Sequence, residues 1–293
     1  MKIIEIENLS KSYGENRGIE NVSFSIEEGE IVGFIGPNGA GKSTTIKILL
    51  NMIFKDSGIA KIFNMDCVEK SKEIKEKIGY VPSEVRFYDS MKVKDIIEYS
   101  MSFYKNCDKE RVRKLCSELE IDLNKKMGEL SLGNKKKVAI VQALVHSPDL
   151  IILDEPTNGL DPLIQKKLFE IILEENKKGK TIFLSSHNLN EIQNYCSKAI
   201  IIKEGKIVDI KEIESLKTIR NKKITIISKD IKEYDIKKLG VESIDKIKDK
   251  ISFSYSGDLN NLIRVLSKYS ISDLSIGEEE LLDTFMNYYE GDK

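Results

Sequence analysis

The segment Gly36–Thr44, with the sequence GPNGAGKST, has the spacing GxxxxGK[ST]. It follows the apolar run IVGFI and precedes the apolar run IKILL, which predicts a strand, a glycine loop and a helix in that order. Backbone N–H groups of such a loop, at a helix N-terminus, bind phosphate oxygens. We expect Lys42 to reach the β and γ phosphates and the Ser43 hydroxyl to bind Mg²⁺. A flexible glycine turn is the alternative, which the two flanking elements disfavour. The pattern therefore predicts a nucleoside triphosphate site made by Gly36, Asn38, Gly39, Gly41, Lys42, Ser43 and Thr44.

Two carboxylates, Asp154 and Glu155, follow the apolar run LIIL at 150–153. The run predicts a buried strand with both acids at its carboxyl end, where sites form in open α/β sheets. We expect Asp154 to hold Mg²⁺ through water and Glu155 to take a proton from the attacking water. The acids alone would equally suit a plain strand end, but a phosphate loop in the same chain favours the catalytic interpretation.

Alternating strands and helices must position these residues. Near-continuous apolar strands alternating with helices predict a parallel sheet covered on both faces. Residues 70–148 show mostly helical spacing, which indicates a helical subdomain, at about 88–147, inserted into an α/β core. The strand patterns are 2–9, 21–26, 30–36, 150–153 and 181–186, followed by a hairpin at Glu204-Gly205, with helices from about 162 and 188.

The chain changes character beyond about residue 217. Strand patterns at 222–228, 241–247, 250–256 and 271–276 are separated by helix patterns at 230–239 and 258–268, and a last helix is expected at 278–289. Asp258 suits the N-cap of the second helix. The order β-α-β-β-α-β-α predicts a small ferredoxin-like α+β domain at 217–293, after a domain at 1–216.

Composition excludes several classes of function. The 47 Lys and Arg nearly cancel the 48 Asp and Glu, giving a net charge of −1, so we expect no nucleic-acid partner. No apolar run approaches the ~20 residues of a membrane helix, and no N-terminal signal is visible. The four cysteines have no CxxC pair or metal-ligand spacing. We expect a soluble protein whose cysteines are reduced, mostly buried thiols.

Three motifs in one order, GPNGAGKST, LIILDEPTNGLDP and FLSSH, resemble those of the ATP-binding subunits of ABC transporters. The resemblance covers about residues 1–216. It implies a P-loop NTPase core with an antiparallel β part and a helical subdomain, and ATP with Mg²⁺ as cofactors. It also implies that two subunits, identical or related, hold two ATP molecules between them. Each nucleotide would contact the phosphate loop of one subunit and the signature loop of the other.

The resemblance assigns roles to residues outside the first two motifs. Tyr13 matches the aromatic residue on which adenine stacks, although an exposed strand-end tyrosine is an alternative. His187 matches the histidine that contacts the γ phosphate and orients the water. Asp161 matches the acid that communicates across the dimer, in a loop that Pro156 and Gly159 shape. The second histidine, His146, is interpreted as structural.

The family's signature loop is usually LSGGQ, and this chain has LSLGN at 130–134. Ser131 and Gly133, the two residues expected to approach the partner's γ phosphate, are retained. Leu132 and Asn134 replace positions that we expect to tune affinity. Ser131 also suits a helix N-cap, and the lysines at 135–137 are interpreted as the solvated face of that helix.

A second departure lies after the strand IGYVP, where the family usually has Gln in contact with Mg²⁺. This chain has Ser83 and Glu84. The Ser83 hydroxyl is a further candidate metal ligand, and Glu84 an acidic substitute. We expect this loop to keep its role in coupling to a membrane partner.

The favoured function is that of an ATPase subunit that drives export through a separate membrane permease, bound to the cytoplasmic face of the membrane through it. Export rests on the resemblance of the C-terminal domain to the appendage of exporter ATPases with separate membrane chains. The alternatives are a regulatory, weakly hydrolysing ATP-binding module and a soluble ABC ATPase of translation or DNA maintenance. Neither the transported substrate nor the choice of homodimer or heterodimer follows from the sequence.

Overall fold

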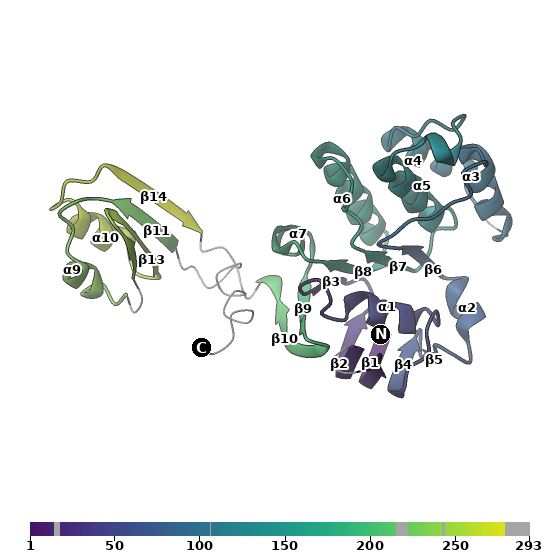
Figure 1. Ribbon diagram of the computed structural model, residues 1–293, viewed down its shortest axis with the longest axis horizontal. Coiled ribbons are helices and arrows are strands. Elements are labelled where there is room, and N and C mark those ends of the chain that lie inside the picture. The colour runs from purple at the N-terminus through teal and green to yellow at the C-terminus, as the bar shows by residue number, and fades with distance from the viewer. Residues whose placement is uncertain (15–17, 106, 215–221, 242–243, 279–293) are drawn as a thin grey trace. The chain divides into compact units, whose positions relative to one another are not determined.

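The structure, a computed structural model, describes residues 1–14, 18–105, 107–214, 222–241 and 244–278. The chain divides into two compact units, Met1–Ile213 and Glu214–Lys293, both drawn in Figure 1. The boundary between the units lies between residues 213 and 214, three residues before the boundary that we predicted from the sequence, between 216 and 217.

The core of the first unit is a six-stranded sheet with the order β10-β9-β3-β8-β7-β6. Its strands from β9 to β6 are parallel, and β10 pairs with β9 in the antiparallel sense. The expected parallel sheet is therefore confirmed, and strands β3, β7 and β8 are buried along their whole length. The strands are β3 (Ile31–Ile35), β6 (Ile78–Val81), β7 (Leu150–Asp154), β8 (Thr181–Ser186), β9 (Lys198–Lys203) and β10 (Lys206–Glu212).

An antiparallel sheet, β2-β1-β4-β5, forms the second layer of this unit. Helix α1 (Lys42–Leu49) contacts β2 and β4 of this sheet and β7 of the core sheet. The rings of Phe24, Phe34 and Phe183 join the layers, with centroids 5.5–5.8 Å apart. The strands are β1 (Lys2–Ser12), β2 (Gly18–Glu27), β4 (Ser57–Ile62) and β5 (Met65–Asp66). The sequence analysis missed β4 and β5, because β4 buries only Ala60 and Ile62 and β5 has two residues.

The inserted helical part contains α3 (Val93–Ser102), α4 (Lys109–Glu118) and α5 (Leu132–Leu144), with a 3₁₀ turn at Met127–Glu129. These three helices lie together beyond β6 and β7 (Figure 1), and α5 packs on β6. Ser131 caps α5, as expected, because its Oγ accepts a hydrogen bond from the Asn134 N–H. The other helices of this unit are α2 (Ser71–Lys75), α6 (Pro162–Lys177) and α7 (Leu189–Tyr195).

The second unit is a four-stranded antiparallel sheet with the order β12-β13-β11-β14. The element order β-α-β-β-α-β and this strand order are those of a ferredoxin-like fold, as expected. Asp258 caps α10, which confirms its expected role. The helix expected at 278–289 lies, from 279 on, outside the described residues. The elements are β11 (Lys222–Ile227), α9 (Glu233–Lys237), β12 (Asp245–Ile247), β13 (Lys250–Tyr255), α10 (Leu259–Leu266) and β14 (Asp273–Glu278).

Two further properties bear on the class of protein. Across the described ranges, no helix combines the length and apolar character needed to cross a bilayer. The four cysteines are free thiols, and three of them are buried, as the sequence analysis expected.

A buried ion pair connects α4 of the helical part to α6 of the core. Arg111 Nη2 lies 2.9 Å from Glu175 Oε2, and the Glu175 side chain is 4% exposed. Arg111 Nη1 also donates to the carbonyl of Leu144, the last residue of α5, at 2.7 Å and to the Ser147 hydroxyl, just after that helix, at 2.6 Å. One guanidinium therefore joins three helices of the first unit.

Removal of this guanidinium is expected to destabilise the first unit. Arg111→Met should lower the free energy of unfolding by about 3–5 kcal/mol, because Lys178 would be the one ion-pair partner left to the buried Glu175 carboxylate among the described residues. Denaturant titration followed by circular dichroism measures this. Lys114→Met is the control, since Lys114 lies on the same helix in an exposed i,i+4 pair. Equal unfolding midpoints for the two variants would contradict the prediction.

Candidate functional site

The glycine loop between β3 and α1 encloses the candidate phosphate site. A cavity of about 350 Å³ is lined by residues 37–44 together with Ser83, Glu84, Glu155 and Asn158. The loop needs glycine at Gly41, whose φ is +108°; a Cβ there would lie 2.5 Å from Ile19 Cγ2. The tight loop places the first N–H groups of α1 at the cavity. The structure thus brings Ser83, Glu84 and Glu155 to the same cavity as the phosphate loop.

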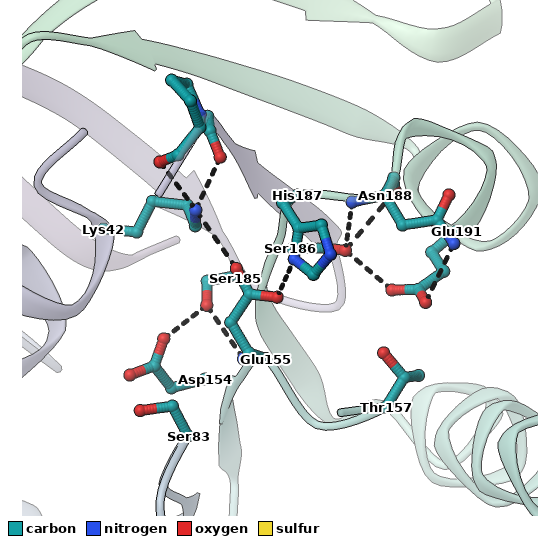
Figure 2. Close-up of polar contacts among 12 residues, drawn as sticks. Lys42, Ser83, Asp154, Glu155, Thr157, Ser185, Ser186, His187, Asn188 and Glu191 are labelled. Carbon is teal, nitrogen blue, oxygen red and sulfur yellow. Dashed lines mark hydrogen bonds and ion pairs between the residues drawn. The ribbon is translucent and has the colours of Figure 1, made fainter. Parts of the chain in front are cut away.

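Glu155 joins the phosphate loop to the end of β8. Its Oε1 lies 3.1 Å from Lys42 Nζ, and its Oε2 lies 2.6 Å from His187 Nδ1. Lys42 Nζ also donates to the carbonyls of Gly36, at 2.6 Å, and Pro37, at 3.2 Å. Figure 2 shows these groups converging from three segments of the core. A carboxylate, an ammonium and an imidazole thus meet beside the phosphate cavity.

Asp154, at the end of β7, is fully buried. Its Oδ1 accepts a hydrogen bond from Ser185 Oγ at 2.6 Å, and the same hydroxyl accepts one from the Glu155 N–H at 3.1 Å, as Figure 2 shows. Asp154 Oδ2 has no hydrogen-bond partner among the described residues. Sequence reasoning missed Ser185, although it lies in the motif FLSSH, two residues before His187; that position was the available signal.

His187 is held by a hydrogen-bonded turn between β8 and α7. The buried Ser186 Oγ donates to Glu191 Oε2 at 2.7 Å and accepts from the Asn188 N–H at 2.9 Å. Asn188 in turn caps α7. Figure 2 shows Ser186, Asn188 and Glu191 on the side of His187 away from Lys42. The turn fixes the backbone on which His187 points toward Glu155.

Tyr13 and Asp161, two further residues predicted to take part in the site, lie apart from the cluster of Lys42, Glu155 and His187. Tyr13 is 52% exposed, beside a hollow of about 760 Å³ that Ser12 and Gly14 help to line. Asp161 caps α6, its Oδ1 accepting from the N–H groups of Leu163 and Ile164 at 3.1 Å each. The adenine contact of Tyr13 and the cross-dimer role of Asp161 stay predictions.

The signature loop presents exposed residues at the start of α5. Ser131 is exposed and Leu132 is 59% exposed. Packing within the chain requires glycine at position 133, because a Cβ there would lie 2.4 Å from the Gly159 carbonyl oxygen. The start of α5 therefore packs closely on the loop that follows Glu155. The contact of Ser131, Gly133 and Asn134 with a partner's nucleotide stays a prediction.

The interpretation of the three lysines as a solvated face is wrong. Lys136 and Lys137 are buried, and half-buried Lys135 lies 3.2 Å from Asp89 Oδ1. Lys136 Nζ donates to the carbonyls of Pro82, at 2.7 Å, and Ser83, at 2.9 Å. Burial lowers the pKa of Lys136 to about 8, against the opposing effect of Asp154 and Glu155. Lys135 and Lys136 lie against the loop after β6 because α5 packs on that strand.

Ser83 and Glu84, which stand where the family usually has Gln, differ in their surroundings. Ser83 is partly buried at the phosphate cavity, whereas the Glu84 carboxylate is 80% exposed and 3.4 Å from Arg86.

His146 stacks on Tyr104, with ring centroids 3.8 Å apart, and lines a different cavity from the phosphate loop. Burial lowers the pKa of His146 to about 4, so the ring is neutral near pH 7.

A glycine loop at a helix N-terminus, with acids and a histidine at the carboxyl ends of neighbouring parallel strands, defines a P-loop nucleotide-binding protein. Residues 19–158 match the family model described as ABC transporter. An uncharacterised ABC transporter ATP-binding protein of Methanocaldococcus jannaschii is 36% identical over 73% of this chain and 79% of its own length. A bacitracin transport ATP-binding protein of Bacillus licheniformis is 31% identical over 99% of this chain and 98% of its own.

Solved structures agree with these relatives. The ATP-binding subunit of an ABC transporter superimposes with a TM-score of 0.68 at 29% identity, over 74% of this chain and 92% of that one. A dimeric ATP-binding cassette bound to ADP and Pi superimposes with a TM-score of 0.65 at 26% identity, over 72% and 98%. The chain belongs to the ABC transporter ATP-binding family, whose members generally hydrolyse ATP.

Ser185 is expected to support the acids on both sides of it. Ser185→Ala removes the donor to Asp154 and one acceptor of the Glu155 N–H, so ATP turnover should fall about 10–100-fold. Steady-state phosphate release measures this, and calorimetry should show unchanged ATP binding in EDTA. Ser197→Ala is the control, because Ser197 donates to the Ile31 carbonyl at the opposite edge of the sheet. Equal turnover in both variants would contradict the supporting role.

Proposed function

We propose that this chain hydrolyses ATP to drive export through separate membrane permease chains, as one of two ATP-binding subunits that close over nucleotide. The observation that carries the proposal is the position of Glu155, which lies within 3.1 Å of Lys42 and 2.6 Å of His187 at the phosphate cavity. A base, a phosphate-binding cation and a water-orienting imidazole are the groups that hydrolysis of a phosphoanhydride needs.

Lys42 exchanges partners in the proposed reaction. Its ammonium now lies among the carbonyls of Gly36 and Pro37 and the carboxylate of Glu155. The β and γ phosphates carry more negative charge than these groups and would draw the ammonium into the cavity. Glu155 would then be free to accept the proton of the attacking water, which His187 would hold in line with the γ phosphate.

The residues beside the phosphate cavity fit Mg²⁺. Asp154 Oδ2 is buried without a hydrogen-bond partner among the described residues, while Ser185 occupies Oδ1. The Ser43 hydroxyl and, through water, Asp154 would hold the ion, with Ser83 as a further candidate. When bound, Mg²⁺ neutralises charge on the β and γ phosphates.

Dimer closure is supported by the exposed start of α5. Ser131 and Leu132 face solvent, and the helix N-terminus adds a favourable site for negative charge. In the dimer, Ser131 would donate to a phosphate held by the partner subunit. The partner is a second copy or a related subunit. One relative of known structure is described as a dimer in a post-hydrolysis state.

A permease would dock on the face that carries the loop after β6. A groove of about 400 Å³ there is lined by residues of that loop and of α5, including Pro82, Arg86, Phe87 and Gln142. Docking there would hold the chain at the cytoplasmic face of the membrane. A transport role is supported by the relative named for bacitracin transport, which the chain matches over nearly its whole length, C-terminal unit included. Export is the direction that we propose from the resemblance of the C-terminal unit to the appendage of exporter ATPases.

Glu155→Gln should stop hydrolysis and stabilise an ATP-bound dimer. The amide keeps the shape of the side chain but does not accept a proton, so turnover should fall at least about 100-fold. Phosphate release and light scattering after gel filtration with Mg-ATP measure the two effects. Glu170→Gln is the control, since Glu170 is an exposed residue of α6. Wild-type turnover in Glu155→Gln would refute the assignment of the base, and an unmodified chain without turnover would favour a regulatory ATP-binding module.

Ser131→Arg should block closure without blocking nucleotide binding. In the Glu155→Gln background, a long cation at the start of α5 would clash where the partner's nucleotide must approach, so Mg-ATP should leave the chain monomeric. ATP affinity of the monomer should stay within about twofold, because the phosphate loop is unchanged. Ser117→Arg, on an exposed position of α4, is the control. Normal dimer formation by Ser131→Arg would remove the role of Ser131 in the partner's site.

A further inference from the structure

Lys136 is a buried cation whose side chain the proposed reaction does not use. It lies in the second turn of α5 and is 1% exposed. Its Nζ donates to two backbone carbonyls of another segment, Pro82 at 2.7 Å and Ser83 at 2.9 Å. Those two residues directly follow β6, where the chain leaves the sheet. The ammonium therefore fastens the first residues of a loop to a helix more than fifty positions away.

The two carbonyls depend on this donor. They lie where the strand ladder has ended, and each would lose its hydrogen bond to Lys136 on removal of the ammonium. Pro82 and Ser83 are partly buried, and a carbonyl that loses its donor there must find water or another donor, so we expect the loop to shift. An unbranched apolar side chain at position 136 would fill the space but supply no donor. The interaction therefore fixes where the loop begins.

The same loop is attached to the segment before α5 at its far end. The Gly128 N–H donates to the Asp89 carbonyl at 3.0 Å, and the Met127 N–H donates to the Met91 carbonyl at 2.9 Å. Lys135 Nζ adds a contact of 3.2 Å with Asp89 Oδ1. The loop is thus bound at both ends to the segment that carries Ser131.

The two segments face different nucleotides in the proposed dimer. Ser83 lines the phosphate cavity of its own subunit. Ser131, five positions before Lys136, is exposed at the start of α5, where the partner's nucleotide would approach. Lys136 joins the two segments, because its Nζ contacts the Ser83 carbonyl and its helix begins at the Ser131 cap.

We propose that Lys136 is a positioning residue that fixes the loop 82–89 to the first turns of α5, so that Ser83 in one nucleotide site and Ser131 in the other move as one body. The inference rests on the proposed function for the second site, but the link itself lies within one chain. Engagement of Ser131 by the partner's ATP would shift Ser83 in its own cavity. A permease bound to the loop would, through the same link, shift Ser131.

Hydrogen–deuterium exchange of the chain without nucleotide tests the link directly. Lys136→Met and Lys136→Gln are neutral and equally long, and they differ in that the amide retains a donor. We expect amides of residues 83–89 to exchange about tenfold faster in Lys136→Met than in wild type, and Lys136→Gln to lie closer to wild type. Lys114→Met, an exposed lysine of the helical part, is the control. Equal exchange of this segment in the Met and Gln variants, or in the Met variant and the control, would overturn the proposal.

Kinetics give a second readout. With the phosphate loop intact, KM for ATP in Lys136→Met should stay within about twofold while kcat falls about tenfold. In the Glu155→Gln background, Mg-ATP should protect residues 131–137 from exchange in both Lys136 variants but fail to slow 83–89 in the Met variant. If Mg-ATP protected both 131–137 and 83–89 in the Lys136→Met variant, the proposal that Lys136 couples the two segments would be overturned. Absence of turnover in the unmodified chain would instead count against the proposed function and leave the nucleotide-free exchange test unaffected.

Discussion

The site depends on the order of three parallel strands, β3-β8-β7, in the core sheet. Parallel strands end at the same edge, so the phosphate loop after β3, Asp154 at the end of β7 and His187 after β8 must lie together. The register aligns Ile35 with Ser186 and Asp154 with Ser185. Since β8 lies between β3 and β7, its last residues pair with the ends of both strands.

The same arrangement decides how the buried charges are tolerated. Asp154 and Glu155 are buried, and an unpaired buried carboxylate would be strongly unfavourable. Ser185 donates to Asp154, while Lys42 and His187 lie against Glu155. Buried ion pairs of this kind add little net stability to a fold. In the proposed reaction, they would hold the candidate base beside the Lys42 ammonium until bound phosphates separate the two.

Sequence patterns predicted the parts of the molecule that local chemistry determines. The glycine loop, the acids and the buried strands have strict spacing or a continuous apolar run, and the helix caps at Ser131 and Asp258 need only neighbouring N–H groups. Lys136 could not be predicted, because its acceptors are backbone carbonyls that leave no mark in the sequence. Within a run of three lysines, the ordinary expectation is solvent exposure. Ser185 was missed for a related reason, since its partner depends on which strands are neighbours.

Packing within the chain explains one retained residue of the signature loop without any contact to nucleotide. Leu132, where the family usually has glycine, is 59% exposed, so its own chain leaves room for a side chain at this position. Gly133 is different, because its Cα lies against the Gly159 carbonyl and any Cβ would clash at 2.4 Å. Gly159 belongs to the loop that joins Glu155 to the cap of α6 at Asp161. The retained glycine thus holds the start of α5 close to the loop after the candidate base. That contact binds α5 to the loop after β7, and Lys136, one turn further on, binds it to the loop after β6. Both of these loops line the phosphate cavity together with the glycine loop.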